Sequence, residues 1–387
     1  MKILYDHQTF TNQNYGGISR YFCELMDNFS VDPDIEPTLA LRYSHNENLC
    51  NRPSLSQYWS SRSEVLCNIQ IFSFLQKIIH INMLNYLRIN QRESISLLKK
   101  QDFELFHPTY YNPYFLKHLQ KKPYALTVYD MIHEIYPQYF SRRDHTKLWK
   151  KKLIEQADAI IAISENTKKD IIKYTNADSD KISVIYLGNP LESMNSPDQT
   201  KNNIKNTIFE TPYLLFVGNR SGYKNFIFFI RSIAKLLKKE ENLHVYCAGG
   251  GSFTQMELKI LNELQISSKV HAIKINDFII KQLYENAEAF IFPSLYEGFG
   301  LPVLEAFSCA CPTVLSNSSS LSEIGADAAS YFDPKDSQSL LNSIEVVLSD
   351  SHYKAQLIKK GIERLKLFSW KNTAIDTKKV YDNLLYQ

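Results

Sequence analysis

The amino-acid sequence predicts an α/β protein built from two Rossmann-like domains. Short apolar runs alternate with helical patterns along most of its 387 residues, and such alternation is typical of parallel sheets covered by helices. A chain of this length favours two domains over one. Residues 188–212 are polar and rich in Asn, Ser and Pro, which predicts a linker. We therefore expect an N-terminal domain of residues 1–190 and a C-terminal domain of residues 191–368, with parallel sheets facing a central cleft that binds ligands.

The expected strands are short apolar runs that separate longer helical patterns. In the first half of the chain they are Ile3–Tyr5, Thr38–Leu41, Leu105–Phe106, Tyr124–Val128, Ala159–Ile163 and Ser183–Ile185. In the second half they are Tyr213–Val217, His244–Ala248, Val270–Ile273, Ala289–Phe292 and Thr313–Leu315. The apolar periodicity predicts helices between them, among them Gly17–Phe29, Phe226–Leu237 and Val303–Ala310.

The composition is that of an ordinary globular protein without a strong global charge. Apolar residues make up 44% of the chain and charged residues 22%, which argues against disorder. The 44 basic and 41 acidic residues give a formal charge of +3, so no overall field marks a nucleic-acid-binding protein. The six Cys include no CxxC pair, as expected for reduced thiols in a cytoplasmic protein. Neither a signal peptide nor a membrane span is predicted.

Positive charge is concentrated in the N-terminal half. Residues 51–152 contain 16 Lys or Arg and 7 Asp or Glu, and no acidic residue occurs between Val65 and Arg92. In this region, Ile69–Leu87 carries apolar residues close to helical spacing. The stretch is either a buried helix with a basic edge or a basic amphipathic surface that docks on anionic lipid headgroups. The second interpretation predicts a peripheral contact with the cytoplasmic face of the inner membrane, and the sequence leaves both open.

The strongest chemical signal is the segment Tyr296–Glu305, which follows the expected strand Ala289–Phe292. Gly298 and Gly300 permit a tight loop whose backbone N–H groups can approach a ligand closely. Pro302 suits the first position of a helix. Free amides at a helix N-terminus form a phosphate site.

Two carboxylates, Glu297 and Glu305, flank this loop. Because a phosphate repels a carboxylate, they need other partners, and hydroxyls are the natural ones. Glu305 suits a ribose diol, and Glu297 suits a sugar hydroxyl near a carbon that becomes cationic. Alternatively, Glu305 only complements the helix dipole and Glu297 is a surface loop residue.

A second segment, Phe216–Asn225, places two cations directly before the expected helix Phe226–Leu237. The helix dipole disfavours cations at that end, so Arg220 and Lys224 indicate an anionic ligand, with bidentate contacts from Arg and a point charge from Lys. Aimed at a diphosphate, the pair would replace a metal ion in stabilising a departing nucleotide. The alternative is two solvated loop cations.

A third segment, Asn14–Tyr21, has Gly16 and Gly17 at the start of the first long helix. A Gly-Gly turn lets the backbone approach a phosphate or a sugar. A simple strand–helix turn explains the pair equally well.

Together these segments resemble the retaining glycosyltransferases of family 4, which have the two-domain GT-B fold. Glu297 and Glu305, with seven residues between them, resemble the E-x7-E motif of that family, and Arg220 and Lys224 resemble its pair that contacts the donor diphosphate. The resemblance covers nearly the whole chain, through the strings GGISRYF, TVYDMIHEIYP, AIIAISENTKKDI and SLSEIGADAASYFDP. The string FVGNRSGYKNF is most similar to a bacterial subgroup that builds O-antigen and capsule polysaccharides, often from GDP-mannose.

The resemblance implies transfer of a hexose from a nucleotide diphosphate to a hydroxyl of a lipid-linked oligosaccharide, with retention and without a metal or other cofactor. Mannose from GDP-mannose is the first expectation, and dTDP-rhamnose, UDP-glucose and UDP-N-acetylhexosamine are alternative donors. The resemblance also implies that a C-terminal helix, residues 369–387, crosses back onto the N-terminal domain.

Each expected role falls on named residues of this sequence. The catalytic residues are Glu297, Arg220, Lys224 and Asp130. The donor-binding residues are Gly17, Arg220, Lys224, Gly298, Phe299, Gly300, Leu301 and Glu305. The acceptor-binding residues are His107, Tyr129 and Asp130.

One position departs from the family pattern. Many members carry a His-Asp pair after the strand that corresponds to Ala125–Val128, whereas this sequence has Tyr129 and Asp130 there. Asp130 is therefore the preferred polar contact to the acceptor or donor sugar, and His107 is the second candidate. The alternative for His107 is a histidine satisfied within the fold beside a turn.

Three other patterns are interpreted as structural. The strings Asp32–Asp34 and Asp178–Asp180 resemble metal-binding pairs but lie in turn-like context. The run Gly249–Gly251 lacks the spacing of a dinucleotide site, and Cys309–Cys311 has no further ligands nearby in sequence. The rival functions are a nucleotide-sugar phosphorylase, hydrolase or epimerase, and a non-catalytic protein that keeps the fold and scaffolds an assembly.

Overall fold

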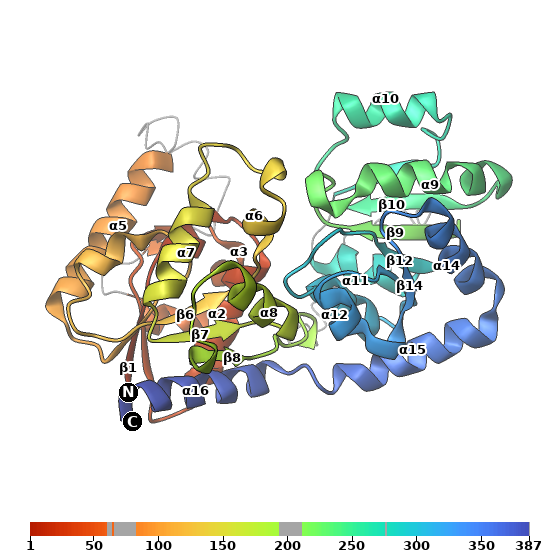
Figure 1. Cartoon of the computed structure of the whole chain (residues 1–387). Helices are drawn as coiled ribbons and strands as arrows, with labels where there is room; N and C mark the ends of the chain where they lie inside the picture. The colour runs from red at the N-terminus through yellow and green to blue at the C-terminus, as the bar shows by residue number, and fades with distance from the viewer. Residues whose placement is uncertain (60–63, 66–82, 193–210, 275–276, 387) are drawn as a thin grey trace. The chain divides into compact units, whose positions relative to one another are not determined.

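The structure is a computed structural model that describes residues 1–59, 64–65, 83–192, 211–274 and 277–386. The chain divides into two compact units (Figure 1). The N-terminal unit comprises Met1–Leu187 and Trp370–Gln387, and the C-terminal unit comprises Gly188–Ser369. The sequence places these boundaries after residues 190 and 368. Most of the predicted linker, and most of Ile69–Leu87, lie outside the described residues.

The N-terminal unit contains two three-stranded parallel sheets. Their strand orders are β2-β1-β5 and β6-β7-β8, and one bridge between Phe106 and Tyr124 links them. The strands are β1 (Lys2–Tyr5), β2 (Glu36–Leu39), β5 (Leu105–His107), β6 (Ala125–Val128), β7 (Ala159–Ala162) and β8 (Ile182–Val184). A separate two-residue pair, β3 (Tyr43–Ser44) and β4 (Glu64–Val65), is too short for the sequence pattern to predict.

The helices of this unit cover its sheets as amphipathic elements. They are α1 (Gln8–Asn12), α2 (Gly17–Phe29), α3 (Glu47–Cys50), α5 (Met83–Lys100), α6 (Ile132–Ile135), α7 (Thr146–Gln156), α8 (Glu165–Tyr174) and α16 (Trp370–Tyr386). The predicted helix Gly17–Phe29 is confirmed as α2, and its residues Phe22, Leu25 and Met26 are fully buried. Burial of this apolar stripe is what stabilises such a helix.

The last helix, α16, belongs to the core of the N-terminal unit. The hydroxyl of Tyr381 lies 2.6 Å from Nδ1 of His107 and 3.2 Å from the hydroxyl of Tyr5, and all three side chains are buried. At the surface, Nζ of Lys378 lies 2.8 Å from a carboxylate oxygen of Asp32. Residues from both ends of the chain therefore complete one core.

The C-terminal unit contains a six-stranded parallel sheet of order β11-β10-β9-β12-β13-β14. Its strands are β9 (Tyr213–Val217), β10 (His244–Ala248), β11 (Val270–Ile273), β12 (Ala289–Phe292), β13 (Thr313–Ser316) and β14 (Ser330–Phe332). The first four have the predicted bounds and β13 is one residue longer than predicted. The sequence pattern does not predict β14, which is three residues long and contains a serine.

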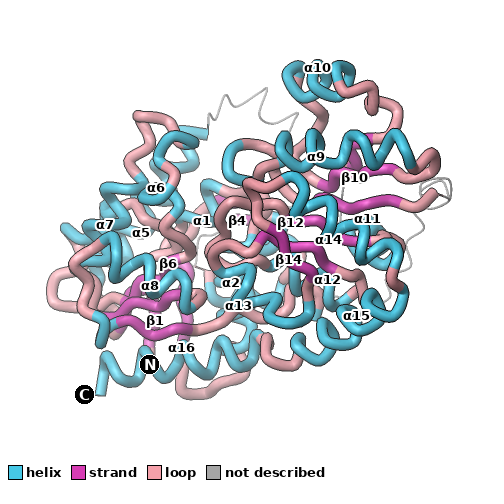
Figure 2. The backbone as a smooth tube through the Cα atoms, turned by 45° about the vertical axis from the view of Figure 1, so that its right-hand side comes forward, coloured by secondary structure: helices cyan, strands magenta, loops and turns pink. Residues whose placement is uncertain are grey.

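Helices flank the strands in both units, as Figure 2 shows in cyan and magenta. In the C-terminal unit they are α9 (Phe226–Lys239), α10 (Gln255–Glu263), α11 (Asp277–Glu285), α12 (Leu301–Ser308), α13 (Ser320–Gly325), α14 (Ser337–Ser349) and α15 (Ser351–Leu365). α9 packs against α14, and α12 packs against α11 and α15. The helix expected over Val303–Ala310 begins two residues earlier, at Leu301, so that Pro302 stands in its first turn.

Candidate active site

The loops that follow β9 and β12 meet where the strand order of the C-terminal sheet reverses. β9 and β12 are neighbours, but the chain leaves β9 for β10 and leaves β12 for β13. Open α/β sheets bind ligands at the carboxyl ends of the strands at such a point. Here Nζ of Lys224, after β9, lies 2.7 Å from Oε1 of Glu297, after β12. The structure thus joins two residues that the sequence predicts separately, 73 positions apart.

The Lys224–Glu297 pair is partly removed from solvent. Only 18% of the Lys224 side chain and 13% of the Glu297 side chain are exposed. The ammonium also lies 5.3 Å from the ring centre of Phe292. The pair therefore lies in a partly dry site, where charges interact strongly and need little reorganisation.

The loop between β12 and α12 is held in a conformation that requires glycine. Gly300 has φ of 111°, and a Cβ there would meet a methyl of Leu321 at 2.9 Å. Oγ of Ser319 accepts the backbone N–H of Glu297 at 2.8 Å, and Oγ of Ser320 lies 2.8 Å from the carbonyl oxygen of Phe299. The loop therefore leads rigidly into the N-terminus of α12, where backbone N–H groups and the helix dipole favour an anion.

Glu305 lies on α12, one turn beyond this N-terminus. Its Oε2 accepts a hydrogen bond of 3.0 Å from the hydroxyl of Tyr284. Tyr284 is buried, and its burial beside Glu305 raises its pKa well above the ordinary value, so the phenol keeps its proton. This bond fixes the direction of the carboxylate.

Arg220 lies in the loop between β9 and α9, as the sequence predicts, and its side chain is buried there. Only 3% of its side chain is exposed, and its Nε lies 2.9 Å from Oε1 of Glu257. Its other two nitrogens donate to the carbonyl oxygens of Gly249–Ser252, at 2.8 to 3.3 Å. The guanidinium also lies 4.8 Å from the ring centre of Phe253. Most of the donors of Arg220 are thus used by Glu257 and by the loop that follows β10, and the expected diphosphate contact stays a prediction.

The carboxylate of Glu257, which pairs with Arg220, accepts hydrogen bonds from two residues. Burial alone would raise the pKa of Glu257, but hydrogen bonds from Thr254 and Arg220 bring it below its usual value. Glu257 also completes a capping box with Thr254 at the start of α10. Arg220 thus connects the loop after β9 to the loop and helix after β10.

Two of the three residues expected to bind the acceptor are part of the core of the N-terminal unit. His107 is fully buried, with Nδ1 2.6 Å from the Tyr381 hydroxyl and Nε2 2.9 Å from Oγ1 of Thr127. Burial lowers the pKa of His107 to about 3. Tyr129 is 7% exposed and its hydroxyl donates to the carbonyl oxygen of Thr109 at 3.3 Å. Neither residue fits the expected contact, because its polar atoms are used inside the fold.

Asp130 differs from these two because 32% of its side chain is exposed. Its Oδ1 accepts the N–H of Ile132 at 3.0 Å, which fixes the carboxylate at the start of α6. Gly17 begins α2 and is exposed, and the preceding carbonyl of Gly16 accepts a hydrogen bond from Asn48 at 3.1 Å. Both residues remain accessible within the N-terminal unit.

The structure adds a polar group that sequence reasoning missed. Asp6 follows β1, is fully buried, and accepts hydrogen bonds of 2.8 Å from both the N–H and the hydroxyl of Thr109, which follows β5. The side chain of Gln8 and the hydroxyl of Tyr114 also donate to it, at 2.7 and 3.0 Å. Its position directly after the first strand is the only signal in the sequence. Asp6 connects the ends of β1 and β5, where the strand order of the β2-β1-β5 sheet reverses.

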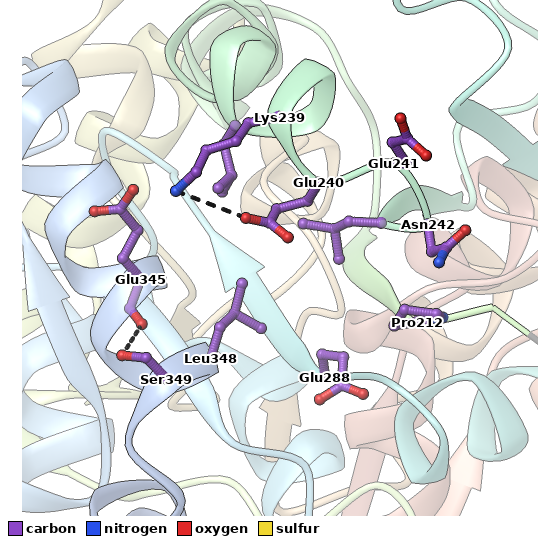
Figure 3. Close-up of a pocket in the computed structure, with 11 residues that line it drawn as sticks. Pro212, Lys239, Glu240, Glu241, Asn242, Glu288, Glu345, Leu348 and Ser349 are labelled. Carbon is purple, nitrogen blue, oxygen red and sulfur yellow. Dashed lines mark hydrogen bonds and ion pairs between the residues drawn. The ribbon is translucent and has the colours of Figure 1, made fainter.

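A hollow in the C-terminal unit lies at the opposite ends of the strands. It has a volume of about 690 Å³ and includes Pro212, Leu243 and Glu288, which directly precede β9, β10 and β12. Figure 3 shows its acidic lining, in which Glu240 pairs with Lys239. None of the predicted site residues lines it, and we do not assign it to the reaction.

The described residues include neither a metal-binding cluster nor a helix that could span a membrane. No group of three or more His, Cys, Asp or Glu side chains within them could hold a metal ion. No described helix combines the length and the apolar character that crossing a bilayer requires.

The chain matches two glycosyltransferase family models. Residues 70–193 match the model described as Glycosyltransferase Family 4, and residues 198–364 match that described as Glycosyl transferases group 1. The chain is 26% identical over 376 residues to O-antigen chain mannosyltransferase B of Escherichia coli, covering 94% of this chain and 95% of that protein. It is 29% identical over 224 residues to O-antigen chain mannosyltransferase RfbU of Salmonella typhimurium, covering 57% and 60%.

A solved structure shows the same fold. HepE of Anabaena, in complex with UDP-glucose, superposes with a TM-score of 0.71 at 16% identity, covering 99% of this chain and all of that one. With the two matched models and the parallel sheet of each unit, this likeness confirms the fold and the resemblance that the sequence motifs indicate. The chain thus carries a Family 4 segment in its N-terminal part and a group 1 glycosyltransferase segment in its C-terminal part, and its fold is GT-B.

Proposed function

We propose that this glycosyltransferase moves mannose from GDP-mannose to a hydroxyl of a lipid-linked oligosaccharide in the synthesis of a bacterial surface polysaccharide. The Lys224–Glu297 pair before α12 carries the proposal, because it places an ammonium, a carboxylate and a helix N-terminus in one loop cluster. The choice of mannose rests on the relatives, two of which are O-antigen mannosyltransferases.

We infer the following roles for the C-terminal unit. Lys224 and the amides at Gly300 and Leu301 stabilise the departing diphosphate. Glu297 accepts a hydrogen bond from a hydroxyl of the transferred sugar, and Glu305 binds the ribose diol. Lys224 and the helix N-terminus supply the charge that a metal would otherwise supply, so the reaction is metal-independent in this proposal.

The proposed mechanism retains the anomeric configuration. The acceptor hydroxyl attacks the anomeric carbon from the face that the diphosphate leaves. The bond from that carbon to the phosphate oxygen breaks, the bond to the acceptor oxygen forms, and the hydroxyl proton passes to the leaving phosphate oxygen. No protein base is required, because the leaving group takes the proton.

The N-terminal unit binds the acceptor in this proposal, at the cytoplasmic face of the inner membrane. One surface on α7 suits an anionic bilayer: Lys147, Lys151 and Lys152 are exposed, and Leu148 among them is 67% exposed. Cations around an exposed apolar side chain are typical of peripheral membrane contacts. We call these four residues, Lys147, Leu148, Lys151 and Lys152, the α7 surface.

The first test is a thermal-shift screen of the purified protein against GDP, UDP, dTDP and CMP in EDTA. A ligand that binds only the native state raises the melting temperature, so GDP alone should raise it, and Lys224→Ala should abolish the shift. Turnover of GDP-mannose with a lipid-linked acceptor, and NMR of the product anomer, then test transfer and retention.

Other outcomes separate the alternatives. A rise in melting temperature with UDP or dTDP instead of GDP would identify a different nucleotide sugar as the donor, and the proposed transfer reaction would stay the same. Donor breakdown that is independent of acceptor would indicate a hydrolase. Loss of activity in EDTA that Mg²⁺ restores would contradict metal independence, and binding without turnover would favour a scaffold.

A further inference from the structure

The loop between β13 and α13 presents a row of serine hydroxyls to the loop that carries Glu297. Residues 316–320 have the sequence Ser-Asn-Ser-Ser-Ser, and we call them the serine loop. The hydroxyls of Ser316 and Ser318 both donate to the carbonyl oxygen of Ser294, at 2.5 and 3.1 Å. The serine loop therefore supports the segment after β12 from its first residues onward.

The last two residues of the serine loop bind the backbone of Glu297 from both sides. Oγ of Ser319 accepts the N–H of Glu297 at 2.8 Å. The hydroxyl of Ser320, which is fully buried, lies 2.8 Å from the carbonyl oxygen of Glu297 and 2.8 Å from that of Phe299. Because a hydroxyl carries one proton, Ser320 shares it between the two carbonyls. Two side chains from another loop thus fix the peptide groups that flank the Glu297 side chain.

Ser319 has a backbone conformation that serine rarely adopts. Its φ is 51° and its ψ is −138°, in a region that glycine enters readily and residues with a Cβ do not. Strain of this kind is concentrated at functional sites, where the surrounding structure maintains it. A glycine at this position would relieve the strain but would lose the hydroxyl that binds Glu297. The strained serine therefore points to a role for its side chain.

We propose that Ser319 and Ser320 are positioning residues for glycosyl transfer, whose hydroxyls fix the Glu297 backbone and so direct its carboxylate toward the transferred sugar. This inference rests on the proposed function in taking Glu297 to contact that sugar. Lys224 holds the carboxylate through Oε1, and the two serines hold the backbone. Because Glu297 is restrained at both ends, it needs little reorganisation as positive charge develops on the anomeric carbon.

Two substitutions at position 319 separate the hydroxyl from the backbone strain. Ser319→Ala loses the hydroxyl and keeps the strain, whereas Ser319→Gly loses the hydroxyl and relieves the strain, so Ser319→Gly should melt at the higher temperature. Both should nevertheless have a kcat at least about tenfold below wild type, because a small misplacement of a catalytic group is costly. The thermal shift with GDP should be unchanged, since GDP lacks the sugar. A Ser319→Gly protein with the wild-type kcat would show that the residue only shapes the backbone, and would overturn the inference.

Substitutions of Ser320 give an independent test with matched controls. Ser320→Ala should also lower kcat at least about tenfold, and Ser320→Thr, which keeps the hydroxyl, should recover most of it. Ser343→Ala removes a buried hydroxyl that donates to the carbonyl oxygen of Tyr331 at 2.8 Å, and it should lower the melting temperature without changing kcat. Ser322→Ala, at an exposed position of α13, should change neither.

The outcomes distinguish this inference from the proposed function. If the variants at positions 319 and 320 lower only the melting temperature, as Ser343→Ala should, the serines are purely structural and the inference alone is overturned. Wild type that turns over no nucleotide sugar would refute the proposed function and this inference with it.

Discussion

Nζ of Lys224 lies 2.7 Å from Oε1 of Glu297, between the loops that follow two neighbouring parallel strands. Neither loop alone is a site: one supplies a cation and the other a carboxylate and a helix N-terminus. Their meeting requires the strand order of this sheet, in which β9 and β12 are adjacent although two strands separate them in sequence.

Substitution of either partner should impair turnover strongly. Lys224→Ala and Glu297→Ala should each lower kcat at least about a hundredfold, the scale for losing one preorganised electrostatic contact. Steady-state kinetics with the donor identified in the screen measure this. Lys238→Ala, an exposed cation of the same unit, is the control and should be neutral. Wild-type rates in both variants would contradict the site.

Arg220 should matter for stability more than for donor contact. Arg220→Met leaves the Glu257 carboxylate buried without its partner, and breaking a buried pair in this way costs about 3–5 kcal/mol. Urea denaturation of the C-terminal unit should show this loss. Lys239→Met removes an exposed pair with Glu240 and should cost less than about 1 kcal/mol. An Arg220→Met protein of normal stability whose donor KM alone is raised would support the direct contact that the sequence predicts.

Acid should destabilise the N-terminal unit through two buried histidines. Burial lowers the pKa of His107 to about 3 and that of His7 to about 4, from 6.5. Below pH 6.5 the unfolded chain takes up protons that the native state does not, so the free energy of unfolding falls as the pH drops toward 4. The slope is at most about 1.4 kcal/mol per pH unit for each histidine.

This pH dependence can be assigned to one residue. Between pH 6 and pH 4.5, His107→Gln should lower the slope of the unfolding free energy against pH by about 1.4 kcal/mol per pH unit, which corresponds to one proton. This change in slope is expected whether or not the substitution alters the stability at pH 7.5. His352→Gln, at an exposed position, should leave the slope unchanged. Equal slopes in wild type and His107→Gln would show that His107 does not titrate as described.

The α7 surface should bind anionic vesicles in a salt-dependent way. Each Lys near an anionic leaflet contributes about 1 kcal/mol, so replacing Lys147, Lys151 and Lys152 with Gln should weaken partitioning roughly a hundredfold. Co-sedimentation with phosphatidylglycerol vesicles at low salt measures this, and high salt should reduce wild-type binding. A matched triple Gln variant at Lys238, Lys239 and Lys259, exposed in the C-terminal unit, should bind normally. Vesicle binding that depends on neither the lipid charge nor the salt concentration would contradict a role of the α7 surface in membrane binding.

Local periodicity was sufficient to predict most of the elements. α2 has the predicted bounds, and so do the first four strands of the C-terminal sheet. β14 is missing from the prediction because three residues carry too little periodicity, and it is recognisable only through its pairing with β13. The E-x7-E segment was likewise predictable, because its glycines and proline act within a few residues of one another.

Roles that depend on distant partners were not predictable. A cation before a helix suggests an anionic ligand, and for Lys224 the structure is compatible with that. For Arg220 the partners are Glu257 and the carbonyls of Gly249–Ser252, about 30 residues away. The polar atoms of His107 are taken by Tyr381, at the far end of the chain. A single sequence shows which groups need partners, but the fold decides where those partners come from.

The N-terminal unit is discontinuous in sequence, and this has a consequence for biosynthesis. Domains fold as they leave the ribosome, and amino-terminal ones usually fold first. Here the C-terminal unit is one continuous segment, whereas the N-terminal unit needs α16 to cover His107 and Tyr5. The part of the chain that is synthesised first is therefore the last to be completed. A nascent chain that stops before Trp370 leaves that core open to chaperones and proteases even though its C-terminal unit is whole.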